Sequence, residues 1–357
     1  MSKTQSLFKT MALPHIPQEE IIFDAPLVAG KYKVGVIGAT GAVGTTVIQL
    51  LHLRCFPLGE LHLYAGPASA GKRIVTPFGR LTLELLDKRH PPILDYAFMA
   101  AGSEVSEEWG WRLARRGAVV IDKSSYFRDK EYAPLVVPEI NRADILTHRG
   151  IIACPNCTTI PLAMVLAPID RLVKINRVTV VTYQSVSGQG RAGIKALENE
   201  LENIEAKPST FTQRIASNVI PWIGARGKLH SGEELKMISE TRRLLKRPRL
   251  SMRVTCARVP VMVGHSMAIH MDTERRVDIP KVYSALQKMQ GITLCDDPSS
   301  DNYPTPLMVA GRDDVMVGRV RRDLGSHSLA LWIVSDNLRK GAATNAVQIA
   351  EAIVATL

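Results

Sequence analysis

The stretch "YKVGVIGATGAVGTTVIQLLHL" (residues 32–53) joins a short β-rich run, a glycine-rich turn and an apolar run. After the turn, Val43, Val47, Leu50 and Leu51 recur at helical spacing. The stretch therefore predicts a strand, a tight loop and a helix in direct succession. This is the unit from which parallel sheets with flanking helices are built.

The loop of this unit has the spacing G-x-x-G-x-x-G. Glycine lets the backbone turn tightly and approach a pyrophosphate, and the helix that follows offers free N–H groups. Glycine triplets also occur in ordinary turns, but a strand before and a helix after them favour a dinucleotide site. The predicted cofactor-binding residues in the loop are Gly38, Thr40, Gly41, Ala42, Val43 and Gly44.

The next β-rich run (59–66) ends in Ala65 and Gly66, where an acidic residue would select NAD. An acid there binds the ribose 2′-hydroxyl and repels a 2′-phosphate, so its absence favours NADP. The nearest cations are Lys72 and Arg73, and NAD remains an alternative.

The pattern of predicted secondary structure changes between the two halves of the chain. Up to Cys157, β-rich runs alternate with helical patterns, which predicts a parallel α/β sheet. From Val178 onward long β-rich runs surround a charged helical stretch (231–245), which predicts an α+β fold with a mainly antiparallel sheet. The predicted units are an extension (1–30), a Rossmann-like dinucleotide-binding domain (31–157) completed by a C-terminal helix (337–357), and an α+β domain (158–336).

Composition excludes several classes of protein. The 357 residues are 46% hydrophobic and carry a net charge of +11, but the basic clusters lack aromatic residues for base stacking, which argues against nucleic-acid binding. No apolar run is long enough to predict a membrane span, and residues 1–30 have no signal-peptide pattern. The five cysteines are too few and too scattered for a disulfide framework, which predicts a reducing, cytoplasmic compartment.

The stretch "IIACPNCTTIP" (151–161) places Cys154 and Cys157 in a C-x-x-C spacing where a strand gives way to a helix. A helix start favours thiolate over thiol, so Cys157 is a candidate nucleophile, although most cysteines are core residues. A zinc site is disfavoured because His265 and His270, five apart in a β pattern, would lie on opposite faces. Cys154 is interpreted as a buried filler, with capture of an oxidised Cys157 as the alternative.

A cysteine nucleophile beside a nicotinamide cofactor predicts thioester chemistry. The thiolate attacks a carbonyl carbon, hydride passes between that carbon and the cofactor, and an acid or base handles protons. The run "RVPVMVGHS" (258–266) offers Arg258 for an anionic substrate and His265 for proton transfer.

From about Tyr32 to its C-terminus, the sequence resembles the bacterial type of aspartate-β-semialdehyde dehydrogenase. Several separate motifs occur in order, and their joint presence makes the resemblance specific. The motifs are "GATGAVG" (38–44), "SSYFR" (124–128), "LVVPEIN" (135–141), "PNCTT" (155–159), "TYQSVSGQG" (182–190), "EELKM" (233–237), "RVPVMVGHS" (258–266), "YPTP" (303–306), "VGRVRRD" (317–323) and "SDNLRKGAATNAVQIAE" (335–351).

The resemblance implies a role for each matching residue. Cys157 would be the nucleophile, His265 the general acid/base, and Gln184 would orient the substrate. Arg258 would bind the substrate carboxylate and Glu233 its amino group. The remaining implied contacts are Arg128, Asn156 and Lys236 with phosphate, and Gly188 and Asn337 with the cofactor.

The resemblance further implies NADPH-dependent conversion of β-aspartyl phosphate to aspartate semialdehyde, on the route to lysine, threonine and methionine. It implies no metal, and it implies that residues 158–336 form a catalytic and dimerisation domain in a homodimer, with a tetramer as the alternative.

Two departures from the family pattern stand out: "AGPASAGK" (65–72) replaces a stretch resembling "ASARSAGK", and Cys154 precedes the nucleophile. The alternatives are another acyl-phosphate reductase, such as N-acetylglutamyl-phosphate reductase or glyceraldehyde-phosphate dehydrogenase, and a non-catalytic binding relative.

Overall fold

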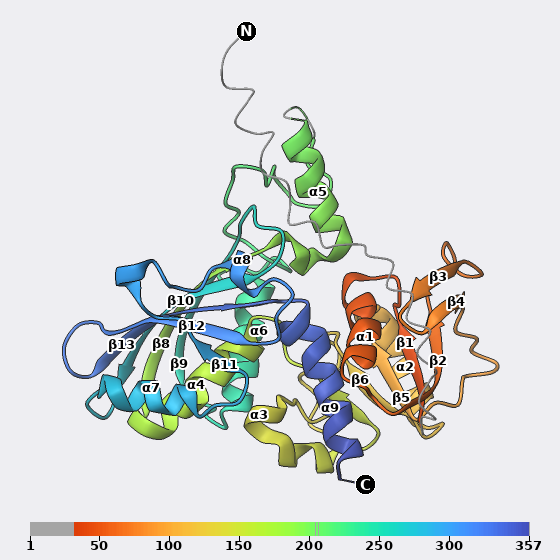
Figure 1. Cartoon of the computed structure of the whole chain (residues 1–357), viewed down its shortest axis with the longest axis horizontal. Coiled ribbons are helices and arrows are strands. Elements are labelled where there is room, and N and C mark those ends of the chain that lie inside the picture. The colour runs from red at the N-terminus through yellow and green to blue at the C-terminus, as the bar shows by residue number, and fades with distance from the viewer. Residues whose placement is uncertain (1–31, 204, 206, 357) are drawn as a thin grey trace.

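The computed structural model describes residues 32–203, 205 and 207–356. Two β-sheets lie side by side in Figure 1, with the C-terminal helix between them. The predicted extension (1–30) lies outside the described residues. Within the described part, no helix has the length and apolar character needed to cross a membrane.

The first sheet has the strand order β3-β4-β2-β1-β5-β6-β7. All its neighbouring pairs are parallel except the β3–β4 hairpin, which the sequence analysis did not predict. The chain continues from β1 to β2 on one side and later returns to β5 on the other, so the strand order reverses at the carboxyl end of β1, where such sheets bind ligands. The strands are β1 (Tyr32–Ile37), β2 (Leu58–Tyr64), β3 (Arg73–Thr76), β4 (Gly79–Glu84), β5 (Tyr96–Met99), β6 (Val119–Asp122) and β7 (Ile151–Ala153).

Helices cover both faces of the first sheet. Val36 of the sheet, Leu50 of α1 and Val347 of α9 belong to one buried apolar cluster, so the end of the chain completes this core. The opposite face packs against α2 through Trp109 and Leu113. The elements around this sheet are α1 (Ala42–Leu53), α2 (Ser103–Ala114), α3 (Pro138–Asn141), η2 (Arg142–Thr147), the π-helical turn η5 (Arg339–Ala343) and α9 (Thr344–Val354).

The second sheet has the order β11-β12-β13-β10-β8-β9. Its central pairs are antiparallel and its two outer pairs, β11–β12 and β8–β9, are parallel, so the expected mainly antiparallel sheet is confirmed. The strands are β8 (Ile175–Gln184), β9 (Ser251–Arg258), β10 (His265–Thr273), β11 (Ile292–Leu294), β12 (Val315–Arg322) and β13 (Ser328–Ser335).

One face of the second sheet is covered by helices (Figure 1). The apolar helix α4 is buried along nearly its whole length, and α6 begins with a capping box between Ser231 and Glu234. On the other face Tyr183 and Trp332 lie 5.5 Å apart between ring centroids, and Tyr183 is exposed. The remaining elements are α4 (Thr159–Val173), η3 (Val186–Gln189), α5 (Gly190–Glu202), α6 (Gly232–Leu244), α7 (Ile279–Gln287), η4 (Pro298–Ser300) and α8 (Pro306–Val309).

Candidate active site

A cleft of about 490 Å³ runs between the two sheets, past the glycine loop before α1 and the start of α4. Most of the residues predicted from the sequence line it together. They are Gly41, Ala42, Val43, Arg128, Asn156, Cys157, Gln184, Gly188, Glu233, Lys236, Arg258 and Asn337. Of the other predicted residues, Gly38 and Thr40 lie in the turn before α1, Gly44 is buried in the first turn of α1, and His265 is fully buried in contact with Cys157.

The glycine loop leaves room for a ligand because two of its glycines allow close backbone approach. Gly38 has φ of +87°, a conformation that favours glycine. A Cβ on Gly44 would lie 2.2 Å from the Gly38 carbonyl oxygen, so only glycine lets α1 start this close to β1. The loop therefore presents backbone and a helix start toward the cleft, which fits the pyrophosphate of a dinucleotide.

Cys157 and His265, 108 residues apart, meet at the end of the cleft. Cys157 Sγ lies 3.5 Å from His265 Nε2. The backbone N–H of Ser185 donates to His265 Nδ1 at 3.1 Å, so Nδ1 has a lone pair and the proton of the neutral ring is on Nε2. The ring therefore presents an N–H donor to the sulfur.

The electrostatics of Cys157 differ from the expectation that the helix start favours a thiolate. Partial burial raises the pKa of Cys157, and the Glu233 carboxylate raises it further. Nearby cations, of which Lys123 has the largest effect, lower the pKa but do not offset this rise. The early N–H groups of α4 also have other partners. Asn156 accepts the Thr158 N–H through Oδ1 at 2.8 Å and the Ile160 N–H through its backbone oxygen at 3.1 Å.

The predicted phosphate-binding residues Arg128 and Asn156 are joined by a carboxylate that the sequence analysis missed. Glu240 of α6 accepts the Asn156 backbone N–H at 2.6 Å and Arg128 Nη1 at 3.0 Å. Asn156 Nδ2 donates to Glu233 at 2.9 Å. Glu240 lies four residues after Lys236, one helical turn along α6, which is the only sequence signal that could have identified it.

Arg258 and Gly188 are packed against each other at the other side of the cleft. Arg258 Nη1 donates to the Ser185 carbonyl oxygen at 2.7 Å. A Cβ on Gly188 would lie 2.6 Å from the same Nη1 and 3.4 Å from the ring of His265. Gln184, which is buried, donates to Thr182 Oγ1 at 3.2 Å.

Asn337 connects the C-terminal segment to the site. Its side-chain oxygen accepts the Gly264 N–H at 3.0 Å and hydroxyl hydrogen bonds from Ser185 and Ser187. Four residues later, a Cβ on Gly341 would lie 3.0 Å from the Cys157 carbonyl oxygen. The turn η5 therefore packs directly behind Cys157.

The cleft has a strong excess of positive charge. Five cationic side chains line it and Glu233 is the one carboxylate among its lining residues. The lining cations are Lys123, Arg128, Arg191, Lys236 and Arg258. Such a cleft suits ligands that carry several negative charges.

The second cysteine of the C-x-x-C pair lies in the core. Cys154 is fully buried in the apolar cluster beneath β1, and burial raises the pKa of Cys154 to about 11. His265 is buried and His270 is exposed, as their spacing in a strand predicts. Among residues 32–356 that the structure describes, no group of three or more His, Cys, Asp or Glu side chains is arranged to hold a metal ion.

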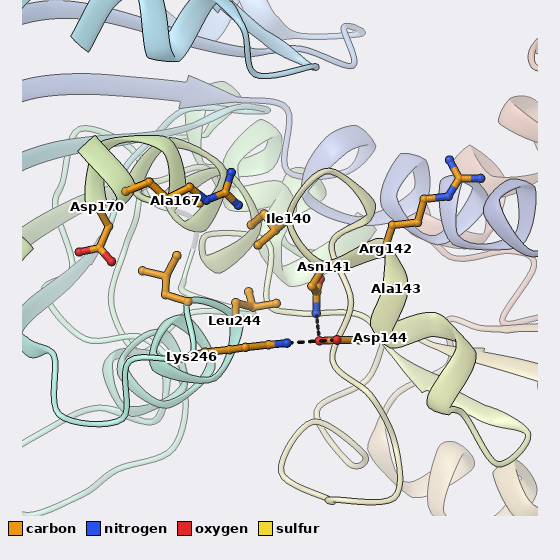
Figure 2. A pocket seen from close by; sticks show the side chains of 11 residues that line it. Ile140, Asn141, Arg142, Ala143, Asp144, Ala167, Asp170, Leu244 and Lys246 are labelled. Atoms are coloured by element: carbon orange, nitrogen blue, oxygen red, sulfur yellow. Dashed lines mark hydrogen bonds and ion pairs between the residues drawn. The ribbon is translucent and has the colours of Figure 1, made fainter. Parts of the chain in front are cut away.

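A second groove, of about 330 Å³, lies where η2 meets the ends of α4 and α6 (Figure 2). Lys246 forms an ion pair with Asp144 there at 3.2 Å, and Asn141 donates to the same carboxylate. None of the residues predicted for catalysis or binding lines this groove. Most of the residues predicted for catalysis and binding therefore gather in the first cleft and not in this groove.

Two family descriptions match almost the whole described chain. "Semialdehyde dehydrogenase, NAD binding domain" matches residues 33–148, and "Semialdehyde dehydrogenase, dimerisation domain" matches residues 166–340. Aspartate-semialdehyde dehydrogenase of Aquifex aeolicus is 41% identical over 90% of this chain and 98% of that protein. The chain belongs to the aspartate-semialdehyde dehydrogenase family.

Other family members agree in sequence and in fold. The enzyme of Bacillus subtilis is 39% identical over 90% of this chain and 96% of that protein. The crystal structure of aspartate semialdehyde dehydrogenase II of Vibrio cholerae, complexed with ASA, superposes with a TM-score of 0.87 at 40% identity, covering 91% of this chain and 98% of that one. Family membership confirms the predicted resemblance and the predicted fold class.

Proposed function

We propose that this member of the family converts β-aspartyl phosphate and NADPH to aspartate semialdehyde, phosphate and NADP through a thioester on Cys157. The observation that carries the proposal is the Cys157 Sγ to His265 Nε2 distance of 3.5 Å at the end of a cleft lined by cations. The excess of positive charge favours a substrate with a phosphate and a carboxylate, as well as an anionic cofactor.

We propose that opposite walls of the cleft bind different parts of the substrate. Arg258 binds the substrate carboxylate with its planar fork, and Glu233 accepts the amino group. Arg128, Asn156 and Lys236 bind the phosphate from the opposite wall. Gln184 orients the acyl group near Cys157, while Gly188 and Asn337 lie along the cofactor side.

In the reductive direction the Cys157 sulfur forms a bond to the acyl carbon, and the carbon–oxygen bond to phosphate breaks with its electron pair on the leaving oxygen. A nicotinamide bound in the cleft supplies the hydride that reduces the thioester carbon. As the carbon–sulfur bond then breaks, its electron pair returns to the sulfur, His265 Nε2–H donates a hydrogen bond to the thiolate that forms, and the aldehyde leaves.

The nucleophile test uses the two cysteines as a matched pair. Cys157→Ala should remove essentially all phosphate-dependent reduction of NADP by aspartate semialdehyde, followed at 340 nm, while cofactor binding persists. Cys154→Ala removes a buried thiol three residues earlier and should retain most of the activity. A tenth or more of the wild-type rate in Cys157→Ala would contradict the role. Turnover of N-acetylglutamate semialdehyde in place of aspartate semialdehyde would favour the rival acyl-phosphate reductase.

We propose NADP as the preferred cofactor, with a modest margin over NAD. Gly66 stands at the start of the loop after β2, in place of an acid that would repel a 2′-phosphate, and Lys72 and Arg73 at the end of that loop are exposed. Gly66 and Ala68 have no side chain that grips the phosphate, so we expect a weaker preference than is usual in the family. Competition between the two cofactors measures it, and a preference above about a thousandfold, roughly 4 kcal/mol, would contradict a modest margin.

We propose a homodimer formed through the uncovered face of the second sheet. Tyr183 and Trp332 lie there, and Ala268 pairs with both Val181 and Trp332 across the strands. A two-fold axis would pair this face with its own copy. In sedimentation velocity the wild type should be a dimer and Trp332→Glu a monomer, and a wild-type tetramer would support the alternative assembly.

A cytoplasmic location stays a proposal that rests on the sparse cysteines.

A further inference from the structure

Lys123 directly follows β6, and its side chain lines the cleft beside Cys157. Its Nζ donates one hydrogen bond, to the Pro155 carbonyl oxygen at 2.8 Å. Among the residues that the structure describes, no carboxylate forms an ion pair with this ammonium group. An ammonium has three N–H donors, so two remain for a ligand in the cleft.

The backbone ties Lys123 to the wall of the cleft that holds the predicted phosphate-binding residues. Arg128 Nη2 donates to the Lys123 carbonyl oxygen at 2.9 Å. Pro155, whose oxygen accepts from Lys123, is the residue before Asn156. Arg258, by contrast, is anchored on Ser185 at the opposite wall. Lys123 therefore belongs with Arg128 and Asn156.

Within the part of the chain that the structure describes, Lys123 has no ion-pair partner, and Glu240 attracts its charge only from a distance. Partial burial and the neighbouring Arg128 guanidinium lower the pKa of Lys123. Glu240, which lies nearby, already accepts hydrogen bonds from Arg128 and from the Asn156 backbone. A cation without a partner in a protein interior is costly, so an anionic ligand would be stabilised here.

We propose that Lys123 is a further phosphate-binding residue, which donates its two free N–H groups to the phosphate of the acyl-phosphate substrate. The proposal rests on the proposed function and adds a residue to it. When the carbon–oxygen bond of the substrate breaks, the electron pair moves to the phosphate oxygen. An ammonium beside that oxygen stabilises the charge that develops on it.

The test measures the aldehyde-oxidising direction with inorganic phosphate as the varied substrate. Lys123→Met removes the charge at similar length and should raise the KM for phosphate about 10- to 100-fold, the range for loss of charge-assisted hydrogen bonds. The KM values for aspartate semialdehyde and NADP should stay within about twofold. Lys123→Arg keeps the charge and should recover most of the loss, and Lys246→Met, in the second groove, is the control that should change none of these constants.

Two kinetic outcomes would overturn the proposal. One is an unchanged KM for phosphate with a lower kcat, which would assign Lys123 to the Cys157 sulfur. The other is an equal rise in all three KM values, which would show a general distortion of the cleft. Thermal unfolding of each variant shows whether the protein is folded under the assay conditions.

A second readout does not depend on turnover. Inorganic phosphate alone should slow alkylation of Cys157 by iodoacetamide in the wild type, and Lys123→Met should need about tenfold more phosphate for the same protection. Equal protection in both proteins would overturn the proposal. If the wild type fails to oxidise aspartate semialdehyde, the proposed function falls, while the alkylation experiment still decides whether Lys123 binds phosphate.

Discussion

His265 is held so that its Nε2–H faces the Cys157 sulfur as a hydrogen-bond donor. The Ser185 N–H occupies the lone pair of Nδ1, so Nε2 bears the hydrogen that points toward Cys157. Burial, followed by the nearby Arg258 cation, lowers the pKa of His265 well below 6.5. The lowered pKa favours the neutral imidazole at and above pH 6.5, so we expect no change in activity there from its protonation.

The reactivity of Cys157 should rise steeply with pH. Its pKa is raised, so the thiolate is a minor species at neutral pH and its fraction grows about tenfold per pH unit below that pKa. We expect the rate of alkylation by iodoacetamide to rise in this way between pH 6 and 8.5, without a break near 6.5. Cys157→Ala is the control for labelling of the other cysteines. A rate that is already constant at pH 7 would show a low-pKa thiolate instead.

Arg258 should not be replaceable by lysine. Its planar guanidinium can bind a carboxylate through two parallel hydrogen bonds while Nη1 keeps its contact with the Ser185 oxygen. Arg258→Lys keeps the charge but loses this fork, and we expect kcat/KM for aspartate semialdehyde to fall about 10- to 100-fold. The KM for NADP and the unfolding temperature should change little. Equal activity of the lysine variant would refute the fork argument.

The turn η3 shows how one short element links binding and proton transfer. It follows β8, carries Ser187 and Gly188, and lies against both Arg258 and His265. Its N-terminal neighbour Ser185 contacts the same two side chains through its carbonyl oxygen and its N–H. The element therefore sets the distance between the Arg258 guanidinium and the His265 ring.

Gly188→Ala tests this spacing. The added methyl would meet Arg258 Nη1 at 2.6 Å and the His265 ring at 3.4 Å, so the arginine would have to move. We expect at least a tenfold loss of kcat/KM with a thermal midpoint close to that of the wild type. Gly190→Ala, where the added methyl meets nothing within 4 Å, is a useful comparison, although its φ of +69° adds backbone strain. Wild-type kinetics in Gly188→Ala would show that η3 shifts to accept the methyl group without disturbing Arg258 or His265.

Elements with a regular spacing of apolar residues could be predicted from the sequence. Elements whose form depends on long-range packing could not. The apolar spacing after the glycine loop predicted α1, and the β-rich runs predicted β8, β9, β10 and β13. The hairpin of β3 and β4 was missed because it is short and half-exposed, with few apolar residues to mark it. The turn η5 was missed because its π-helical form depends on packing behind Cys157, which no local pattern encodes.

Across the whole molecule, the motifs predicted which residues converge but not what supports them. Cys157, His265 and Asn337 come from three distant segments and meet at one cleft, and their roles remain predictions. Glu240 and Lys123 could not be predicted from the sequence, because it is their contacts with Arg128 and Asn156 in the folded protein that bring them to the site. The division into residues 31–157 and 158–336 likewise remains a prediction.

A buried ion pair anchors the C-terminal segment. Lys340, which is 1% exposed, donates to both carboxylate oxygens of Glu139 at 2.7 and 2.8 Å. Lys340→Met leaves that carboxylate unpaired and should lower the free energy of unfolding by about 3–5 kcal/mol in urea titrations. Lys246→Met, which breaks the exposed pair with Asp144, should cost about 1 kcal/mol or less. Equal losses in both variants would refute this difference.

A segment far along the sequence, η5 and α9, completes the nucleotide-binding half. Val347 of α9 completes the apolar cluster beneath β1, and Gly341 lies against Cys157. During translation, the glycine loop and Cys157 leave the ribosome long before these partners exist. A nascent chain therefore exposes part of the core of its first sheet until α9 has been made, and loss of η5 and α9 would remove support from the glycine loop and from Cys157 together.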